Sequence, residues 1–287
     1  MFNKKLGIGF QEAKKITKKF AKTFYTASLF LPEEKKYASY AVYAICRLSD
    51  EAVDDLACSD REKSLQRLES KISASYTEKH FEEPLLAAFS QTVNKYKIPG
   101  EYFASLIKGM RMDLELKRYA SFTLLYEYCY RVAGVVGLIM LKIFGYKNSS
   151  AEENAIKLGV AMQLTNILRD INEDLGRGRI YLPLDEMAKF NITERQLSEG
   201  RINKNLKDFL RFQISRCRKF YSDSLEGVKL INSPFCRFVV LCMKEIYAGI
   251  LEKIEENNYN VFTVRAHVSK LRKIMIILKI LLERKYL

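Results

Sequence analysis

The sequence predicts an all-α protein. Apolar residues recur with the 3.6-residue period of an α-helix over long stretches, and period-two alternation is never sustained. Only five prolines and thirteen glycines interrupt the 287 residues, and no Asn-Gly pair indicates a β-hairpin. Because 48% of the residues are hydrophobic, the chain can bury a substantial core, and no repeat or linker indicates a second domain.

The predicted helices follow one another with short connections. A basic amphipathic helix is expected over 9–31, where apolar residues from Phe10 to Phe24 alternate with lysines. Pro32 suits the first position of the next helix, whose N-terminus Glu33 and Glu34 favour. Further helices are predicted over 60–77, 83–97, from 100 through GMRMDLELKRY, and over 121–146, 151–174, 203–230, 234–257 and 262–284.

The predicted helix over 121–146 is apolar enough to be buried. Ala133, Gly134 and Gly137 leave little side-chain bulk along one side of it. Small residues there permit either close packing against another helix or an empty channel. Of these two interpretations we favour close packing.

Two short stretches carry the main chemical signal. Each places oxygen-bearing side chains four residues apart, so that on a helix they share one face. We call them the first and second acidic ladders, and they consist of Asp50, Glu51 and Asp54, and of Asn166, Asp170 and Asp174.

Acidic pairs at helical spacing are common on solvated helix faces, where they have no special role. Here the runs YAVYAIC and LGVAMQLTNIL that lead into the ladders are apolar on several sides, which is typical of buried helices. Buried acids need countercharges, and nearby arginines are Arg47, Arg169, Arg177 and Arg179. If the ladders face each other, Mg²⁺ is the expected countercharge, because it prefers hard oxygen ligands. Mg²⁺ in turn suggests a diphosphate substrate.

Several other classes of site are disfavoured. The six cysteines show no CxxC spacing and the two histidines lie far apart, so neither zinc nor a disulfide framework is expected. The N-terminal segment mixes lysines with apolar residues, which does not match a secretory signal, and we expect a cytoplasmic protein. The apolar run over 274–282 is too short to cross a bilayer.

The net charge of +14 allows nucleic acid, an anionic membrane surface or anionic substrates as partners. We expect no nucleic acid, and we assign the basic helix from Phe10 to Phe24 to peripheral contact with a membrane surface. The competing interpretation is that these lysines only keep the fold soluble. The sequence gives no prediction of oligomeric state.

Six ordered stretches resemble the phytoene and squalene synthase family, the head-to-head isoprenyl diphosphate synthases. They are AKTFY (21–25), YAICRLSDEAVD (43–54), GMRMDL (109–114), YCYRVAGVVG (128–137), LTNILRDINEDLGRGRIYLP (164–183) and NNYNVFTVRAHVSK (257–270). Their details are more similar to phytoene synthases than to squalene synthases. The resemblance implies a single isoprenoid-synthase domain over 1–287, a helical bundle around a central apolar cavity.

The resemblance also implies roles for single residues. Both ladders would hold Mg²⁺, or Mn²⁺ in its place, and the ions would bridge the substrate diphosphates. Tyr128 matches a cavity tyrosine that could steady cationic intermediates or assist proton movement, although a structural tyrosine is the alternative. One departure is Ala21 with Thr23, since some relatives carry serines at both positions. Positions that match diphosphate-binding residues are Lys22, Arg47, Gln163, Arg179 and Tyr259.

The implied reaction condenses two prenyl diphosphates through a cyclopropyl diphosphate, with phytoene from two geranylgeranyl diphosphates as the expected product. The alternatives are squalene or dehydrosqualene from farnesyl diphosphate, and only squalene would require NADPH. The loop GRGRIYLPLDE is no dinucleotide fingerprint, because it follows a helix and precedes a proline. Rival hypotheses are a helical nucleic-acid-binding protein and a catalytically silent assembly factor of the same fold. Intact ladders oppose both.

Overall fold

The computed structural model describes residues 2–55, 60–78 and 80–283, and it confirms the all-α fold class. In that part of the chain, β-pairing is confined to two isolated bridges, Arg118 with Ile180 and Tyr146 with Ile231. The cysteines that it describes are free thiols, and Cys58 lies outside it.

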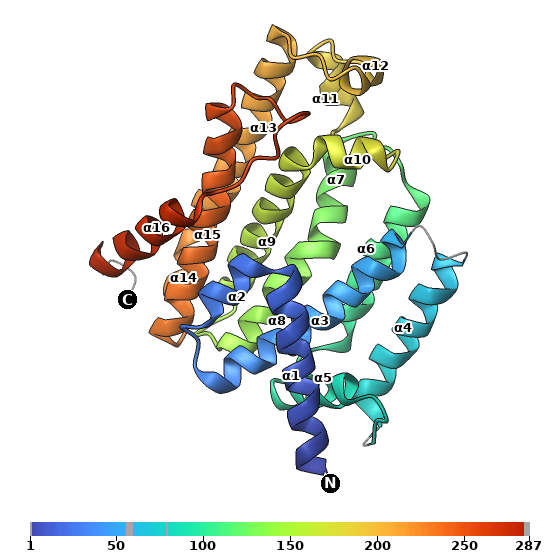
Figure 1. Ribbon diagram of the computed structural model, residues 1–287, viewed down its shortest axis with the longest axis vertical. Helices are drawn as coiled ribbons and strands as arrows, with labels where there is room; N and C mark the ends of the chain where they lie inside the picture. Colours follow the sequence, from blue (N-terminus) through green and yellow to red (C-terminus); the bar gives the residue numbers. More distant parts are fainter. Residues whose placement is uncertain (1, 56–59, 79, 284–287) are drawn as a thin grey trace.

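The helices are arranged as a bundle whose long members run roughly along the molecule (Figure 1). The first half contains α1 (Phe2–Phe20), α2 (Lys22–Ser28), α3 (Glu33–Asp54), α4 (Arg61–Thr77), α5 (Pro84–Lys95), α6 (Gly100–Glu115), α7 (Phe122–Cys129), a π-helical turn (Tyr130–Gly134) and α8 (Val135–Phe144). The second half contains α9 (Ser150–Arg169), α10 (Ile171–Gly176), α11 (Leu184–Lys189), α12 (Glu194–Ser198), α13 (Lys204–Asp223), α14 (Leu225–Lys229), α15 (Pro234–Glu256) and α16 (Lys270–Glu283).

Helix α9 is the central element of the bundle. It packs against α8, α13, α14, α15 and the π-helical turn (Figure 1). One hydrophobic cluster joins α3, α5, α6 and α8, with Tyr40, Phe89 and Phe103 at its centre. A second cluster joins α7, α9, α13 and α15, and includes Phe209 and Leu251. The two clusters hold opposite sides of the bundle and leave room between them for the cavity described below.

The predicted helix over 9–31 is wrong in its bounds, because α1 begins at Phe2 and the helix breaks at Ala21. Ala21 has φ −124° and ψ 57°, which turns the chain so that α2 leaves in a new direction. No glycine or proline occurs between Phe10 and Leu31, so local composition gave no signal for this break. The apolar side of α1 is covered by α3 and α5, and its lysines face outward.

The predicted helix over 151–174 is interrupted at Asp170, whose φ of −104° and ψ of 16° separate α9 from α10. The four-residue spacing nevertheless survives, because the Asp170 amide donates to the Asn166 carbonyl and the Asp174 amide to the Asp170 carbonyl, each at 2.9 Å. Two other predictions were too long: α13 ends at Asp223, and the last helix begins only at Lys270. The short helices α11 and α12 were not predicted.

The continuous helix Phe122–Phe144 contains the π-helical turn and is long and apolar enough to cross a membrane by length and composition. It packs against α6 and α9, which accounts for its apolar character. A Cβ on Gly137 would lie 2.4 Å from the Ala155 carbonyl oxygen, and one on Gly159 would lie 2.3 Å from that of Ala133. The predicted close helix packing is therefore present. Since Ala133 and Gly137 also line the cavity, both interpretations of the small residues apply to this helix.

Candidate active site

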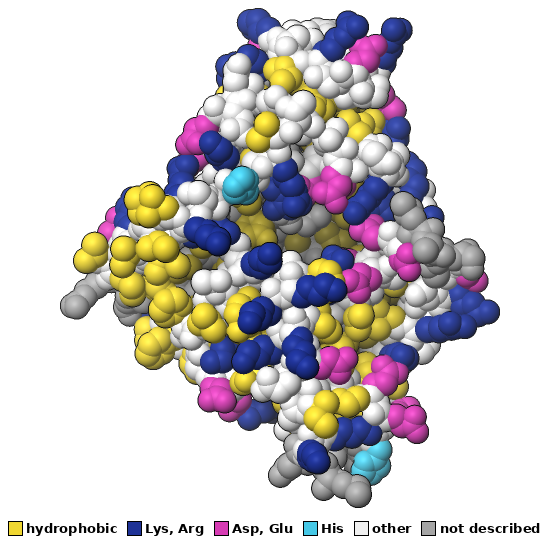
Figure 2. All heavy atoms as spheres, in the orientation of Figure 1, with side chains coloured by type: hydrophobic (Ala, Val, Ile, Leu, Met, Phe, Trp, Pro, Cys, Tyr) yellow, Lys and Arg dark blue, Asp and Glu magenta, His cyan; other side chains and the backbone are white. Residues whose placement is uncertain are grey.

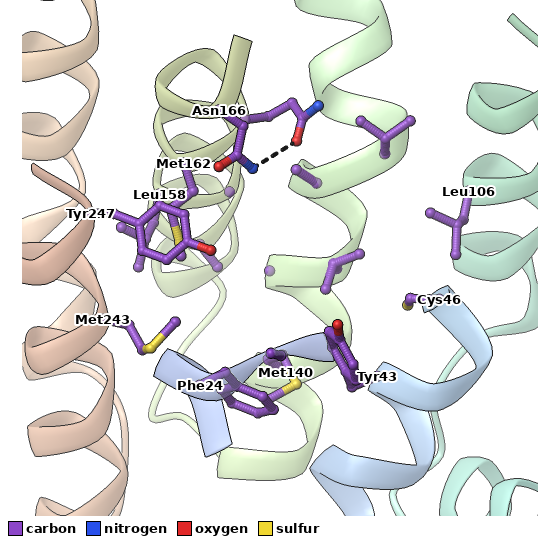
Figure 3. Close-up of a pocket in the computed structure, with 18 of the residues that line it drawn as sticks. Phe24, Tyr43, Cys46, Leu106, Met140, Leu158, Met162, Asn166, Met243 and Tyr247 are labelled. Carbon is purple, nitrogen blue, oxygen red and sulfur yellow. Dashed lines mark hydrogen bonds between the residues drawn. The ribbon is translucent and has the colours of Figure 1, made fainter. Parts of the chain in front are cut away.

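A cavity of about 600 Å³ opens between α2, α3, α6, α8, α9 and α15. Most of its wall is apolar (Figure 3). Phe24 and Met140 lie at its lower end in that view, and Met243 and Tyr247 project into it from α15. Further apolar lining residues are Leu106, Val132, Ala133, Val136, Leu158 and Met162. This is the central apolar cavity that the resemblance implied.

The other end of the same cavity is polar. Members of both ladders line it, so the fold brings α3 and the α9–α10 junction face to face across the opening. Glu51 is not part of the wall, and its Oε1 accepts a hydrogen bond from Arg47 Nε at 3.1 Å. The polar lining residues include Asp50, Asp54, Gln163, Asn166, Asp170 and Asp174, together with Arg47, Arg169, Arg177 and Arg179.

Two arginines from the loop after α10 hold Asp54. Arg177 Nη1 donates to one carboxylate oxygen at 3.0 Å, and Arg179 Nη1 donates to the other at 2.9 Å. Gly178, between them, has a φ of +72°, a left-handed conformation that glycine adopts without strain. This turn lets both neighbours reach the same carboxylate. Sequence reasoning placed both arginines near the ladders, and the structure shows that they pair with the first ladder.

Two other arginines hold Asp170. Arg169 forms a bidentate contact with it, and Arg265 Nε donates to its Oδ1 at 2.8 Å. Burial alone would raise the pKa of the Asp170 carboxyl, but these two guanidinium groups together lower it. Arg265 comes from the segment before α16, which the structure brings over the second ladder.

Among the described residues, no guanidinium group makes such a direct contact with Asp50 or Asp174. Loss of hydration raises the pKa of the Asp50 carboxyl to about 7, with the negative charges of Asp54 and Asp113 adding to the effect. Loss of hydration likewise raises the pKa of Asp174 to about 7, and the charge of Asp170 adds to it. Both carboxyls therefore lie in an environment that favours an added positive charge or a proton.

Asn166 is a further residue whose surroundings fit a cation site. Its amide nitrogen lies 3.4 Å from Gln163 Oε1 (Figure 3), while its own Oδ1 is buried and accepts no hydrogen bond from the described residues. A buried acceptor without a partner is costly unless a ligand completes it. The available donors are thus carboxylate and amide oxygens, the ligand types that Mg²⁺ binds.

The ladders do not form a ready-made metal cage. Across 2–55, 60–78 and 80–283, no three Asp, Glu, His or Cys side chains are gathered closely enough to hold an ion. Asp54 and Asp170 instead pair with guanidinium groups, Asp54 with Arg177 and Arg179 and Asp170 with Arg169 and Arg265. The residue types fit divalent cations, and these arginines would have to release their carboxylates for the ladders to close on them.

A buried network lies just below the ladders. Tyr128 and Tyr181 both donate to Asp113, at 3.0 and 2.6 Å, and their rings stack with centroids 5.1 Å apart. Burial raises the pKa of Asp113, and burial followed by the nearby Asp113 charge raises that of Tyr128 well above its ordinary value. Tyr128 is therefore a neutral phenol in the cavity wall. Sequence reasoning had assigned no role to Asp113 or Tyr181, although both lie within the family-like stretches.

Three of the predicted diphosphate-binding residues, Arg47, Lys22 and Tyr259, lie in environments that differ from one another. Arg47 lines the cavity, and its guanidinium lies 4.4 Å from the centroid of the Phe20 ring. Lys22 is exposed at the start of α2 and is not part of the cavity wall. Tyr259 is buried outside the wall, where Arg211 Nε donates to its hydroxyl at 3.1 Å.

Comparison with known proteins identifies relatives over nearly the whole chain. Residues 17–272 match the profile of the squalene/phytoene synthase family. A phytoene synthase from Arthrospira platensis is 39% identical over 280 residues, which cover 93% of this chain and 90% of the relative. A 15-cis-phytoene synthase from Synechococcus elongatus is 37% identical, with 94% and 91% covered. The crystal structure of a dehydrosqualene synthase in complex with ligand superposes with a TM-score of 0.92 at 30% identity, covering 99% of both chains.

Proposed function

The chain belongs to the squalene/phytoene synthase family, whose members are prenyltransferases, and we propose that it joins two geranylgeranyl diphosphates to form phytoene. The condensation proceeds head to head through a cyclopropyl diphosphate and releases diphosphate. One observation carries the proposal: two acidic ladders line the polar end of a single cavity whose remaining wall is apolar. Relatives named phytoene synthase, at 37–39% identity, favour phytoene as the product.

Enzymes of this family act on prenyl diphosphates and are in general metal-dependent. We propose Mg²⁺, with Mn²⁺ as the alternative, held by Asp50, Asp54, Asn166, Asp170 and Asp174. Glu51, which lies outside the cavity wall and pairs with Arg47, would join these ligands only after local rearrangement. When bound, the ions would neutralise the charge that develops on the departing diphosphate. The unpaired Oδ1 of Asn166 and the raised pKa values of Asp50 and Asp174 support this assignment.

The arginines have two roles in this proposal. First, Arg177 and Arg179 neutralise Asp54, and Arg169 and Arg265 neutralise Asp170, so that the ladders can face each other without strong repulsion. With substrate present, the same guanidinium groups are available to the diphosphate oxygens, which they match in geometry. We assign the same role to Arg47, and to Gln163 beside Asn166. Lys22 and Tyr259, which lie outside the cavity wall, would join the diphosphate site only after local rearrangement.

The apolar part of the cavity excludes water from the cationic intermediates. Aromatic side chains of the wall, including Phe24, Tyr43 and Tyr247, present ring faces that stabilise positive charge. Tyr128 is held by Asp113 as a hydrogen-bond donor and stays protonated, so its ring is suited to the same task. We therefore assign removal of the final proton to the departing diphosphate.

A second candidate product follows from the structural comparison. The TM-score of 0.92 with a dehydrosqualene synthase supports farnesyl diphosphate as an alternative substrate, with dehydrosqualene as its product, or squalene if a nicotinamide cofactor reduces it. The purified protein should be incubated with the C15 and then the C20 diphosphate, with and without NADPH, and the hydrocarbon analysed by mass. Phytoene from the C20 substrate, independent of NADPH, is the expected result. If only a C30 hydrocarbon forms, the second candidate replaces phytoene synthesis. If no hydrocarbon forms at all, the result supports the silent assembly factor.

A further inference from the structure

Helix α16 is apolar on its outer as well as its inner side. Ile276, Ile277 and Ile280 pack against the two hydrophobic clusters of the bundle. The opposite side of the helix is uncovered in the described part of the chain, where Leu278 is 52% exposed and Leu282 82%. The other exposed apolar residues of α16 are Leu271, Ile274, Met275 and Leu281. A surface helix of a soluble bundle normally presents polar residues on this side.

Neighbouring segments add to this apolar surface. Leu29 and Phe30, directly after α2, and Phe235, at the start of α15, are also exposed. Helix α16 lies against α15, and Lys273 Nζ ties it to α2 by a 2.8 Å hydrogen bond to Thr23 Oγ1. The largest hydrophobic area in Figure 2 lies on this side, over the position of α16 in Figure 1. We call it the α16 patch.

Basic side chains border the α16 patch. Figure 2 shows a band of Lys and Arg beside it, across the part of the surface where α1 and α2 lie in Figure 1. Lys279 is 73% exposed within the patch itself, and its aliphatic stem can lie along an apolar surface while the ammonium group reaches outward. Exposed lysines of α1 and α2 include Lys15, Lys18, Lys19 and Lys22.

We propose that the α16 patch docks on an anionic phospholipid bilayer, with the apolar side chains of α16 inserted and the adjacent lysines on the headgroups. An apolar helix face bordered by basic residues is the combination that binds such interfaces. A second copy of this chain is the less favourable occupant, because it would bring two strongly basic surfaces together. Since the apolar side of α1 is buried against α3 and α5, α1 contributes charge to this contact and α16 contributes insertion.

The need for such a surface rests on the proposed function, because a product that has lost both diphosphates is a hydrocarbon that water does not dissolve. The patch is well placed for product release. Helices α2 and α15 form the wall between α16 and the cavity, through Phe24, Met243 and Tyr247. Docking through α16 would therefore set this wall of the cavity against the lipid.

Flotation of the full-length protein with vesicles of phosphatidylcholine and phosphatidylglycerol tests the proposal. The variant Ile274→Glu/Leu278→Glu replaces two exposed side chains, so the fold should tolerate it. Its partition coefficient onto the vesicles should fall about tenfold or more. The matched control is Ile202→Glu/Phe212→Glu, which makes the same charge change at apolar residues that are 37% and 41% exposed and do not belong to α1, α2 or α16. The logarithm of the control's partition coefficient should fall by less than half as much as that of the α16 variant.

Equal losses in both variants, or wild-type flotation of the α16 variant, would overturn the proposal. So would a wild-type dimer that the α16 substitutions convert to a monomer, since the patch would then be a contact between copies. Hydrocarbon formation from the C20 diphosphate in detergent is measured in parallel. Unchanged formation with lost flotation supports the docking surface, whereas flotation without any hydrocarbon refutes the proposed function and leaves docking supported.

Discussion

The aspartates of the two ladders, at the polar end of the cavity, are of two kinds. Each ladder has one aspartate with two arginine partners, Asp54 or Asp170, and one with no arginine partner in the described part of the chain, Asp50 or Asp174. The paired acids hold the loop after α10 and the segment before α16 in place. The unpaired acids remain open to an added cation, which is the property that a metal-dependent diphosphate site requires.

Removing one of the two carboxylates that pair with arginines should abolish the proposed release of diphosphate without unfolding the protein. Asp170→Ala removes an oxygen ligand of the second ladder and lowers the repulsion at Asp174, so Mg²⁺-dependent diphosphate release should fall roughly 100-fold or more. Asp54→Ala should lower diphosphate release to a similar extent, because Asp54 is a proposed ligand on the opposite ladder. Release of diphosphate and circular dichroism are measured together, with Asp185→Ala as a control at an exposed acid in the first turn of α11. Turnover near that of the control would remove Asp170 from the site.

The two unpaired acids predict how stability depends on pH in the absence of metal. Their folded-state pKa values of about 7 lie above the ordinary carboxyl value, so the fold prefers the protonated forms. This contribution to stability is complete at acid pH and is lost as the pH rises through 7. The melting temperature without metal should fall by roughly 3–6 °C between pH 5.5 and 8.5, and Asp50→Asn should reduce that slope.

Magnesium should act against this trend, because the ion favours the ionised carboxyls. Its addition should raise the melting temperature more at pH 8.5 than at pH 5.5. Scanning calorimetry at both pH values, with and without Mg²⁺, measures each effect. A melting temperature that climbs steadily with pH in metal-free buffer would contradict the unpaired state of Asp50 and Asp174.

At the scale of elements, the continuous helix Phe122–Phe144 both packs closely and lines the cavity. Both Ala133 and Gly137 line the cavity, and the backbone packs against α9 at both positions, Gly137 against Ala155 and Ala133 against Gly159. The sequence showed that small residues cluster here. It could not show that the same positions meet both α9 and the cavity, because the π-helical turn rotates the residues after it relative to a regular helix.

Substitutions at these two positions are expected to give different results. Ala133→Phe should fill part of the cavity, shift the preference from the C20 towards the C15 diphosphate and leave the melting temperature nearly unchanged. Gly137→Ala should lower stability by about 1–3 kcal/mol, because its Cβ would lie 2.4 Å from a backbone oxygen of α9. Competition between the two substrates and thermal melting distinguish these effects. Equal loss of stability in both variants would show that the Ala133 side chain also packs against protein.

At the scale of the whole molecule, the parts that sequence predicted are those set by local pattern. Helical periodicity predicted the fold class, and four-residue spacing predicted the ladders. The contacts of Arg265 with Asp170 and of Asp113 with Tyr181 join residues 95 and 68 positions apart, which no local pattern contains. The surroundings of Tyr259 were missed for the same reason, since its partner Arg211 comes from α13.

The distribution of charge over the whole surface gives the last prediction. If the lysines of α1 contact anionic headgroups, Lys15→Gln/Lys18→Gln should weaken binding to anionic vesicles by roughly 30-fold at low salt, at about 1 kcal/mol for each residue. The control Lys63→Gln/Lys108→Gln makes the same charge change on α4 and α6 and should have little effect. Raising the salt concentration should bring wild type and variant together, because screening removes the electrostatic part and leaves the α16 insertion. A difference between them that persists at high salt would mean that these lysines act through the fold, and flotation independent of salt in the wild type would exclude their electrostatic role.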